Sequence, residues 1–200
     1  MAKIKLTKNE LKKQKDALKM FTRFLPTLIL KKQQLQMEIR KVEEREALVR
    51  GEKQAIEEDF RRWIAVFGED VGLDESLLAL KEVKTSIGNI AGVKIPVFEG
   101  ASFAPVSYDL WSKPPWVDKA VRELQRVMLL DLELRILEEQ RRLLAIELRI
   151  TTQRVNLFEK VKIPETKTNI KRISIYLGDQ QTAAVVRGKI SKRGLERAAS

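Results

Sequence analysis

The stretch VMLLDLELRILEEQRRLLAIELRITTQRVNLF, residues 127–158, decides the fold of this chain. Steps of three and four residues along it visit ten positions, eight of them apolar: Val127, Leu130, Leu134, Leu137, Arg141, Leu144, Leu148, Thr151, Val155 and Phe158. The residues between are mostly Glu, Arg and Gln. A period of 3.5 residues is typical of a helix that winds around another helix. We therefore expect a helix over roughly 116–177 and a partner helix of similar length.

The partner is the N-terminal part of the chain. The segment Thr7-Lys8-Asn9-Glu10 is a capping box, which predicts a helix start at Thr7. From Leu11 the same stepping visits sixteen positions up to Trp63, and twelve are apolar. The four polar positions of this stripe are Gln14, Lys32, Glu46 and Lys53. Lys32, Glu46 and Lys53, together with Arg141 in the second stripe, could either specify register or contact a partner.

Two prolines fall inside these helices. Proline removes a backbone hydrogen bond and costs about 3 kcal/mol or more in a helix interior. Because the apolar register continues across Pro26, we expect a kink there and not a break, and the same at Pro164. In an antiparallel pair, facing residue numbers add up to a constant. With Trp63 near Val121 that constant is 184, which puts Leu28 near Asn156 and Leu11 near Ile173.

The middle of the chain has a different pattern. Residues 74–81 suit a short helix, and alternating apolar positions around Val83–Ile87 and Val93–Val97 then favour two strands. Pro96 restricts its strand to an edge, and Gly88, Gly92 and Gly100 suggest turns. We expect a small β-hairpin module that packs on the coil near Trp63.

The predicted fold class is therefore all-α dominated: a long two-helix antiparallel coiled coil with a small β-hairpin and short-helix module at the turn end. The first helix is expected over residues 1–67, the hairpin module over 68–115 and the second helix over 116–177. Residues 178–200, which include RGKISKRGLER, are expected to form a basic C-terminal tail that is mobile in isolation.

Composition excludes several kinds of chemistry. The chain has no Cys and no His, which excludes disulfides, thiol and imidazole catalysis and the usual zinc sites. It has no GxxxxGK[ST] or GxGxxG loop for phosphates. Acidic pairs such as Glu43-Glu44 and Glu138-Glu139 are interleaved with Lys and Arg, which favours solvated helix faces over metal ligands. We predict no catalytic residues, no metal site and no cofactor.

The net charge of +11 is concentrated at the two ends of the chain. Residues 1–20 have a net charge of +5 and residues 160–200 of +7, so the rest sums to −1. Antiparallel folding would bring both basic ends to one tip, which suits an acidic socket, a nucleic acid or an anionic membrane surface. Simple solvation of both ends is the plainer alternative.

The sequence also bears on location. No apolar run approaches the roughly 18 residues of a membrane span, and the Lys-rich N-terminus lacks the apolar core of a signal peptide. We expect a cytoplasmic protein with no direct membrane span.

Four segments, in order along nearly the whole chain, are similar to the D subunit of the V-type and archaeal A-type rotary ATPases. They are KLTKNELKKQK at 5–15, NIAGVKIPVFE at 89–99, TQRVNLFEKVKIPETKTNIKRI at 152–173 and KISKR at 189–193. The third is the most specific. The chain departs from the family pattern at Pro26 and at DQQTAAVV, residues 179–186, where relatives have an acidic run.

The resemblance implies a central-stalk rotor shaft with no active site of its own. It would transmit torque between a hexamer of catalytic and non-catalytic subunits and the ion-translocating ring, peripheral to the membrane. The F subunit and a membrane-proximal adaptor protein are the further partners implied, and no nucleic acid. The residues predicted to contact partners are Lys3, Lys5, Lys8, Lys12, Arg154, Asn156, Lys189, Lys192 and Arg193. A prefoldin-like chaperone or scaffold arm and a basic RNA-binding arm are the alternatives.

Overall fold

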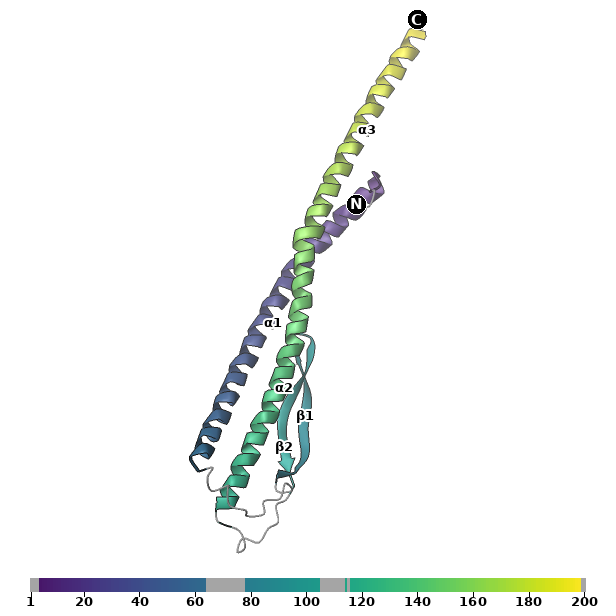
Figure 1. The fold of residues 1–200 in the computed structure, drawn as a ribbon. Helices are drawn as coiled ribbons and strands as arrows, with labels where there is room; N and C mark the ends of the chain where they lie inside the picture. The colour runs from purple at the N-terminus through teal and green to yellow at the C-terminus, as the bar shows by residue number, and fades with distance from the viewer. Residues whose placement is uncertain (1–3, 64–77, 105–113, 115, 199–200) are drawn as a thin grey trace. The chain divides into compact units, whose positions relative to one another are not determined.

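A computed structural model describes residues 4–63, 78–104, 114 and 116–198 (Figure 1). Helix α1 spans Lys8–Trp63, and strands β1 (Leu80–Ile90) and β2 (Val93–Phe103) form an antiparallel hairpin. Helix α2 spans Trp116–Asn156, passes through a π-helical segment, η3 (Leu157–Lys162), and continues as α3 (Ile163–Ala198). The predicted fold class, two long helices with a small hairpin, is confirmed.

The chain divides into two compact units. We call Met1–Lys32 with Ile150–Ser200 the basic unit, and Gln33–Arg149 the hairpin unit. The basic unit contains the start of α1, the end of α2, η3 and α3. The hairpin unit contains the rest of α1 and α2 together with both strands.

Helix α1 begins where the capping box predicts. The Glu10 amide donates to Thr7 Oγ1 at 3.3 Å, and the Leu11 amide donates to the Thr7 carbonyl at 3.0 Å. The first bond satisfies an amide that a helix start otherwise leaves without a partner, and the second is the first bond of the regular helical ladder. The Glu10 carboxylate accepts from Gln14 Nε2 at 2.9 Å. The helix continues through Pro26, and the predicted continuity of the seam across it is confirmed.

The predicted apolar seam is the buried face of both helices. On α1, every seam position from Leu11 to Phe60 is buried or half-buried, the four polar ones included. On α2 and η3, Arg141 is exposed, while the nine other seam positions are buried or half-buried. Leu35 and Leu144 are fully buried in the core cluster of the hairpin unit. The 3.5-residue period thus identified the core correctly.

Ion pairs across the helices give the register of the hairpin unit. Their numbers add up to between 178 and 188, around the predicted 184. The pairs are Arg45–Glu133 (2.8 Å), Lys53–Asp131 (2.7 Å), Glu46–Arg141 (3.2 Å), Arg50–Glu138 (3.5 Å) and Asp59–Lys119 (3.9 Å). Higher numbers on α1 meet lower numbers on α2, so the pair is antiparallel and its register is confirmed here.

The hairpin turns at Ala91-Gly92, where both residues have positive φ, 52° and 83°. Two such residues form the turn whose twist matches that of paired strands. Of the three predicted turn glycines, only Gly92 lies in a turn. Gly88 lies inside β1 opposite Ile95, and Gly100 lies in β2 beside a register shift that leaves Glu99 without a partner residue. The predicted helix over 74–81 lies largely outside the described residues, and its end, Leu80 and Lys81, belongs to β1.

The hairpin packs lengthwise along α2 (Figure 1). Ile95 is buried in the cluster with Leu137 and Leu144, and Gln140 Nε2 donates to the Pro96 carbonyl at 2.5 Å. Ile90, Ala91 and Val93 at the turn pack against the same cluster. The module therefore contacts the coil as far as Gln140, well beyond the Trp63 level where we expected it. Its opposite face includes Ile87, which is 79% exposed.

Pro164 has a visible structural effect. In η3 the Ile163 amide donates to the Phe158 carbonyl, a step of five residues instead of four. A π-turn inserts one residue into the helix. The seam accordingly shifts by one position: Thr166 and Ile173 are buried, whereas Glu165 and Arg172 are exposed. The expected disturbance at Pro164 is thus a change of helical pitch just before the proline.

Beyond Leu177 the seam ends but the helix does not. Residues 178–195 are all exposed, as expected for a segment outside the seam. The segment predicted as a separate basic tail is a helical continuation of α3 to Ala198. The segment contains no proline, and Gln, Ala, Arg and Lys favour helix despite Gly178, Gly188 and Gly194.

Candidate subunit interface

The charge of the chain lies in one unit. The basic unit has 21 Lys and Arg against 6 Asp and Glu, a net +15, and the hairpin unit has 18 against 22, a net −4. A compact unit of this charge attracts acidic surfaces over about 8 Å at physiological salt. The basic unit is therefore the strongest candidate for a polar docking surface.

All nine predicted contact residues fall in the basic unit. Lys3 lies outside the described residues. Lys5 precedes α1, and Lys8 and Lys12 lie in its first turns; Arg154 and Asn156 end α2. Lys189, Lys192 and Arg193 lie on the exposed part of α3. The other eight residues are all exposed. Exposure does not test a contact with a partner, so the role of these residues stays a prediction.

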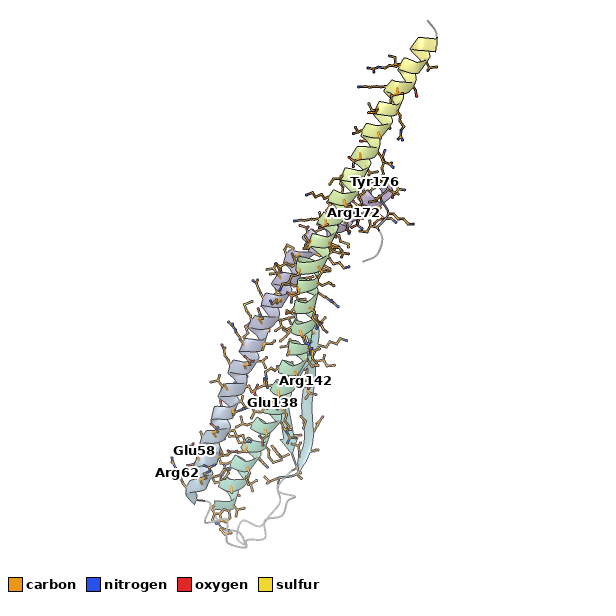
Figure 2. The ribbon with its side chains drawn as sticks, turned by 45° about the horizontal axis from the view of Figure 1, so that its top comes forward. Glu58, Arg62, Glu138, Arg142, Arg172 and Tyr176 are labelled. Carbon is orange, nitrogen blue, oxygen red and sulfur yellow. The ribbon has the colours of Figure 1, made fainter. Side chains whose placement is uncertain are left out.

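Sequence reasoning missed the apolar side chains that accompany these charges. On α3, four large apolar residues past the seam are exposed to between 49% and 72%: Val185, Val186, Ile190 and Leu195. Figure 2 labels Arg172 and Tyr176, whose exposed side chains project from α3 just before them. The sequence did contain a signal for them, namely apolar residues beyond Leu177, where the apolar seam has ended. A helix that exposes both cations and branched apolar side chains suits a partner that covers it.

The polar seam residues of the hairpin unit have partners inside the chain. Glu46 is nearly buried between Arg50, at 2.7 Å, and Arg141, at 3.2 Å. Lys53 Nζ donates to Asp131 at 2.7 Å, and this hydrogen bond raises the pKa of Lys53 above 10.5. Glu46, Lys53 and Arg141 thus form cross-helix pairs, which favours the interpretation that they specify register.

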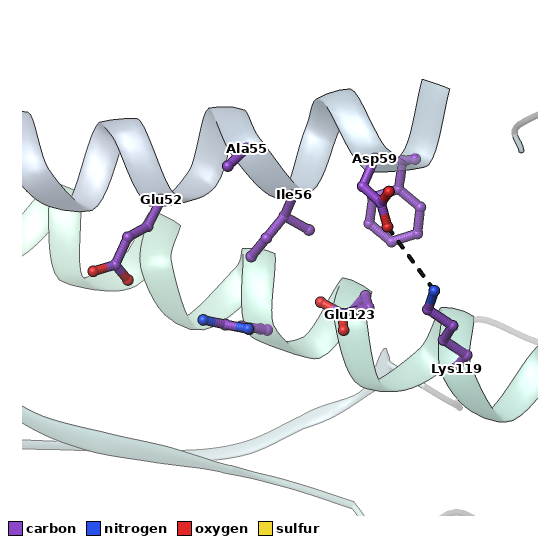
Figure 3. Close-up of a pocket in the computed structure, with 8 residues that line it drawn as sticks. Glu52, Ala55, Ile56, Asp59, Lys119 and Glu123 are labelled. Atoms are coloured by element: carbon purple, nitrogen blue, oxygen red, sulfur yellow. Dashed lines mark ion pairs between the residues drawn. The ribbon is translucent and has the colours of Figure 1, made fainter. Parts of the chain in front are cut away.

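A groove of about 360 Å³ opens between α1 and α2 in the hairpin unit (Figure 3). The Asp59 and Lys119 side chains approach to 3.9 Å across it. Glu52 lines it from α1, Glu123 and Arg126 line it from α2, and Ile56 and Phe60 supply apolar surface. Asp59 pairs with Lys119 across the groove, and acidic, basic and apolar residues line it together, which suits a solvated interhelical groove.

Two kinds of feature are absent from the ranges that the structure describes. In 4–63, 78–104 and 116–198 no cluster of three carboxylates is arranged to hold a metal ion. Over the same ranges no helix is both long and apolar enough to cross a bilayer.

Comparison with known proteins gives a consistent result. The family model for the ATP synthase D subunit matches residues 10–193. The chain belongs to the ATP synthase D-subunit family. It is 55% identical over 195 residues to a V-type ATP synthase D subunit of Borreliella burgdorferi, covering 98% of this chain and 96% of that protein. It is 32% identical over 201 residues to the V-type ATP synthase D subunit of Chlamydia muridarum, covering 98% and 97%.

Membership of the D-subunit family confirms the resemblance found in the sequence. The rotor-shaft role follows from the family: the D subunit is the central-stalk shaft of a V-type rotary ATPase. The family match over 184 residues, 10–193, leaves no support for the chaperone-arm and RNA-binding alternatives. As a member of this family the chain is part of a multi-subunit complex.

Proposed function

We propose that the basic unit is the end of the shaft that docks in the hexamer of catalytic and non-catalytic subunits, and that the chain itself catalyses nothing. The observation behind the proposal is the charge division, +15 against −4. A shaft that turns must not bind any one position too tightly. Many screened charge contacts, added to exposed apolar surface on α3, meet that requirement.

One asymmetric shaft inside a hexamer makes a different contact with each catalytic subunit. A ligand shifts a conformational equilibrium only by its differential affinity for the two states. The basic unit would therefore bias the catalytic subunits in turn as it rotates. The F subunit and a membrane-proximal adaptor complete the proposed set of partners, and the complex lies on the cytoplasmic side of its membrane.

A charge-reversal pair tests the docking proposal. The first variant combines Lys189→Glu, Lys192→Glu and Arg193→Glu on α3; its control combines Lys41→Glu, Arg62→Glu and Lys84→Glu, exposed cations of the hairpin unit. Both change the net charge by the same amount. We expect the first to weaken binding to the purified hexamer on the order of tenfold or more and to reduce its salt dependence.

Stoichiometry and turnover complete the test. One copy per hexamer, with ATP turnover altered by the wild-type chain and by the control variant, supports the proposal. Six copies per hexamer, equal weakening by both variants, or binding without any change in turnover contradicts it.

A further inference from the structure

The basic unit contains two backbone irregularities that face each other. Pro26 interrupts the hydrogen-bond ladder of α1, and η3 with Pro164 interrupts that of the second helix. The Phe21 and Phe158 rings, 5.1 Å apart with an interplanar angle of 48°, put the two sites at the same level. At 1.5 Å per residue, Pro26 lies roughly 8 Å along its helix from that contact.

The irregularities remove backbone hydrogen bonds. Proline has no amide hydrogen, so the carbonyls of Thr22 and Lys160 lose the donors that residues 26 and 164 would supply in an α-helix. Threonine hydroxyls also donate to backbone carbonyls here: Thr27 to Phe24 at 2.8 Å, and Thr168 to Pro164 at 3.0 Å. Bonds of this kind favour helix bending.

Side-chain packing at this level is also thin. No residue of η3 is buried, and its Leu157 and Val161 are exposed. Phe24, one turn from Phe21, is half exposed. Local opening and bending concentrate where few apolar contacts support the backbone. The hairpin unit differs at each point, because its α1 segment, residues 33–63, has no proline and its helices are joined by ion pairs.

We infer that residues 22–27 of α1 and 157–164 of the second helix form a flexural and torsional hinge, held together by the Phe21–Phe158 contact. Both helices of the pair are softened at one level, so bending there does not oppose an intact neighbouring helix. The aromatic contact keeps the two helices together while each backbone deforms. The hinge is a property of the chain alone and does not depend on what the chain docks to.

Spin-label distance measurements on the full chain test the hinge, since the absence of Cys allows clean double labelling. Labels at Lys13 and Leu30 bracket Pro26, and labels at Arg154 and Lys171 bracket η3 and Pro164. Labels at Lys41 and Glu58 have the same 17-residue spacing without an irregularity and serve as the control. All six positions are exposed.

We expect distance distributions across the hinge at least about 1.5 times as wide as in the control pair. Pro26→Ala and Pro164→Ala should each narrow the distribution of the helix they belong to, and Phe21→Ala should widen both without loss of helix content by circular dichroism. Widths equal to the control, or widths that neither proline substitution narrows, would overturn the hinge.

Amide exchange gives a second readout. The amides of residues 22–27 and 157–163 should exchange faster than those of residues 39–49, and equal exchange rates would also contradict the hinge.

Discussion

The two units of this chain pair the same helices by different means. The hairpin unit has a continuous apolar cluster around Leu35 and Leu144, covered by Ile95 and flanked by cross-helix ion pairs. In the described part of the basic unit, the buried positions are Thr151, Val155, Thr166 and Ile173, half of them polar. The hairpin unit therefore has the larger apolar core and more cross-helix ion pairs, while the basic unit exposes more charge and, on α3, apolar side chains.

The difference shows how one long coiled coil can have two roles. A net charge of +15 destabilises a compact unit by self-repulsion, while a net charge near zero does not. The hairpin unit is thus expected to unfold later and to fix the register. The basic unit is expected to gain much of its order from acidic partners.

The largest expected effect is the loss of a core leucine. Leu144→Ala should lower the free energy of unfolding by about 2–5 kcal/mol, because Leu144 is fully buried in the hairpin unit. Ile173→Ala is the matched truncation in the basic unit. Its loss of unfolding free energy should lie near the low end of that range, because we expect the less packed basic unit to relax into the cavity. Urea unfolding followed by circular dichroism measures both.

The control for this pair is Ile146→Ala, because Ile146 is two residues from Leu144 but exposed. The free energy of unfolding of this variant should be within about 0.5 kcal/mol of the wild-type value. A loss at Ile173 as large as that at Leu144 would contradict the assignment of greater stability to the hairpin unit.

Substitution of two glycines of the hairpin unit by alanine distinguishes the effect of side-chain packing from that of helix propensity. A Cβ at Gly88 would lie 2.9 Å from Val97 Cγ2, so Gly88→Ala should cost about 1–3 kcal/mol by overpacking the hairpin. Gly51, in the middle of α1, has open space around it, so Gly51→Ala should gain about 0.5–1 kcal/mol. Thermal unfolding of the two variants gives the signs, and a stabilising Gly88→Ala would show that the hairpin does not pack as described.

Added salt should slow amide exchange in the basic unit but not in the hairpin unit. The screening length falls from about 30 Å at 0.01 M to about 3 Å at 1 M salt. Self-repulsion in the basic unit is then relieved, and amide exchange in residues 8–25 and 165–177 should slow on the order of fivefold. Exchange in residues 35–49 should stay level or quicken, since Arg45–Glu133 and its neighbours are screened. An equal change in amide exchange rate along the whole of α1 would show that charge repulsion does not distinguish the two units.

The smallest expected effect is a pH dependence from Lys53. Its hydrogen bond to Asp131 raises its pKa above 10.5, so the folded chain holds the proton more tightly than the unfolded chain. The stabilisation is complete below the unfolded pKa and is lost as pH rises through the raised pKa. For a partly exposed pair the loss should be about 0.5 kcal/mol. Lys53→Met should remove this part of the slope of unfolding free energy between about pH 9 and 11.5, and an unchanged slope would refute the assignment.

The seam and the register were predictable because apolar periodicity reports directly on burial. Leu35, Val49 and Leu144 follow from spacing alone, and the constant of 184 follows from where the helices turn. The shift at η3 was not predictable in this way. A proline in the sequence shows that one backbone hydrogen bond of the helix is lost. It does not show whether the helix will kink, end or insert an extra residue at that point.

The hairpin and the contact residues were only partly predictable. Alternation predicted two strands, yet Gly88 was taken for a turn because sequence does not reveal that Val97 leaves no room for a Cβ beside it. The partner contacts that we predict for Lys189 and Arg193 depend on surfaces of other molecules. Charge clustering shows that such surfaces should be acidic, and nothing in one chain specifies their shape.

The constant register has a consequence for insertions and deletions. One residue added to α2 between Glu133 and Arg141 would rotate every following side chain by about 100° relative to those before it. The pairs Arg45–Glu133 and Glu46–Arg141 could then not both form unless α1 changed in step. The basic unit has already absorbed one such residue at η3 without interrupting its helix. Changes in chain length should therefore be tolerated singly near residue 160 and only in matched pairs between 33 and 149.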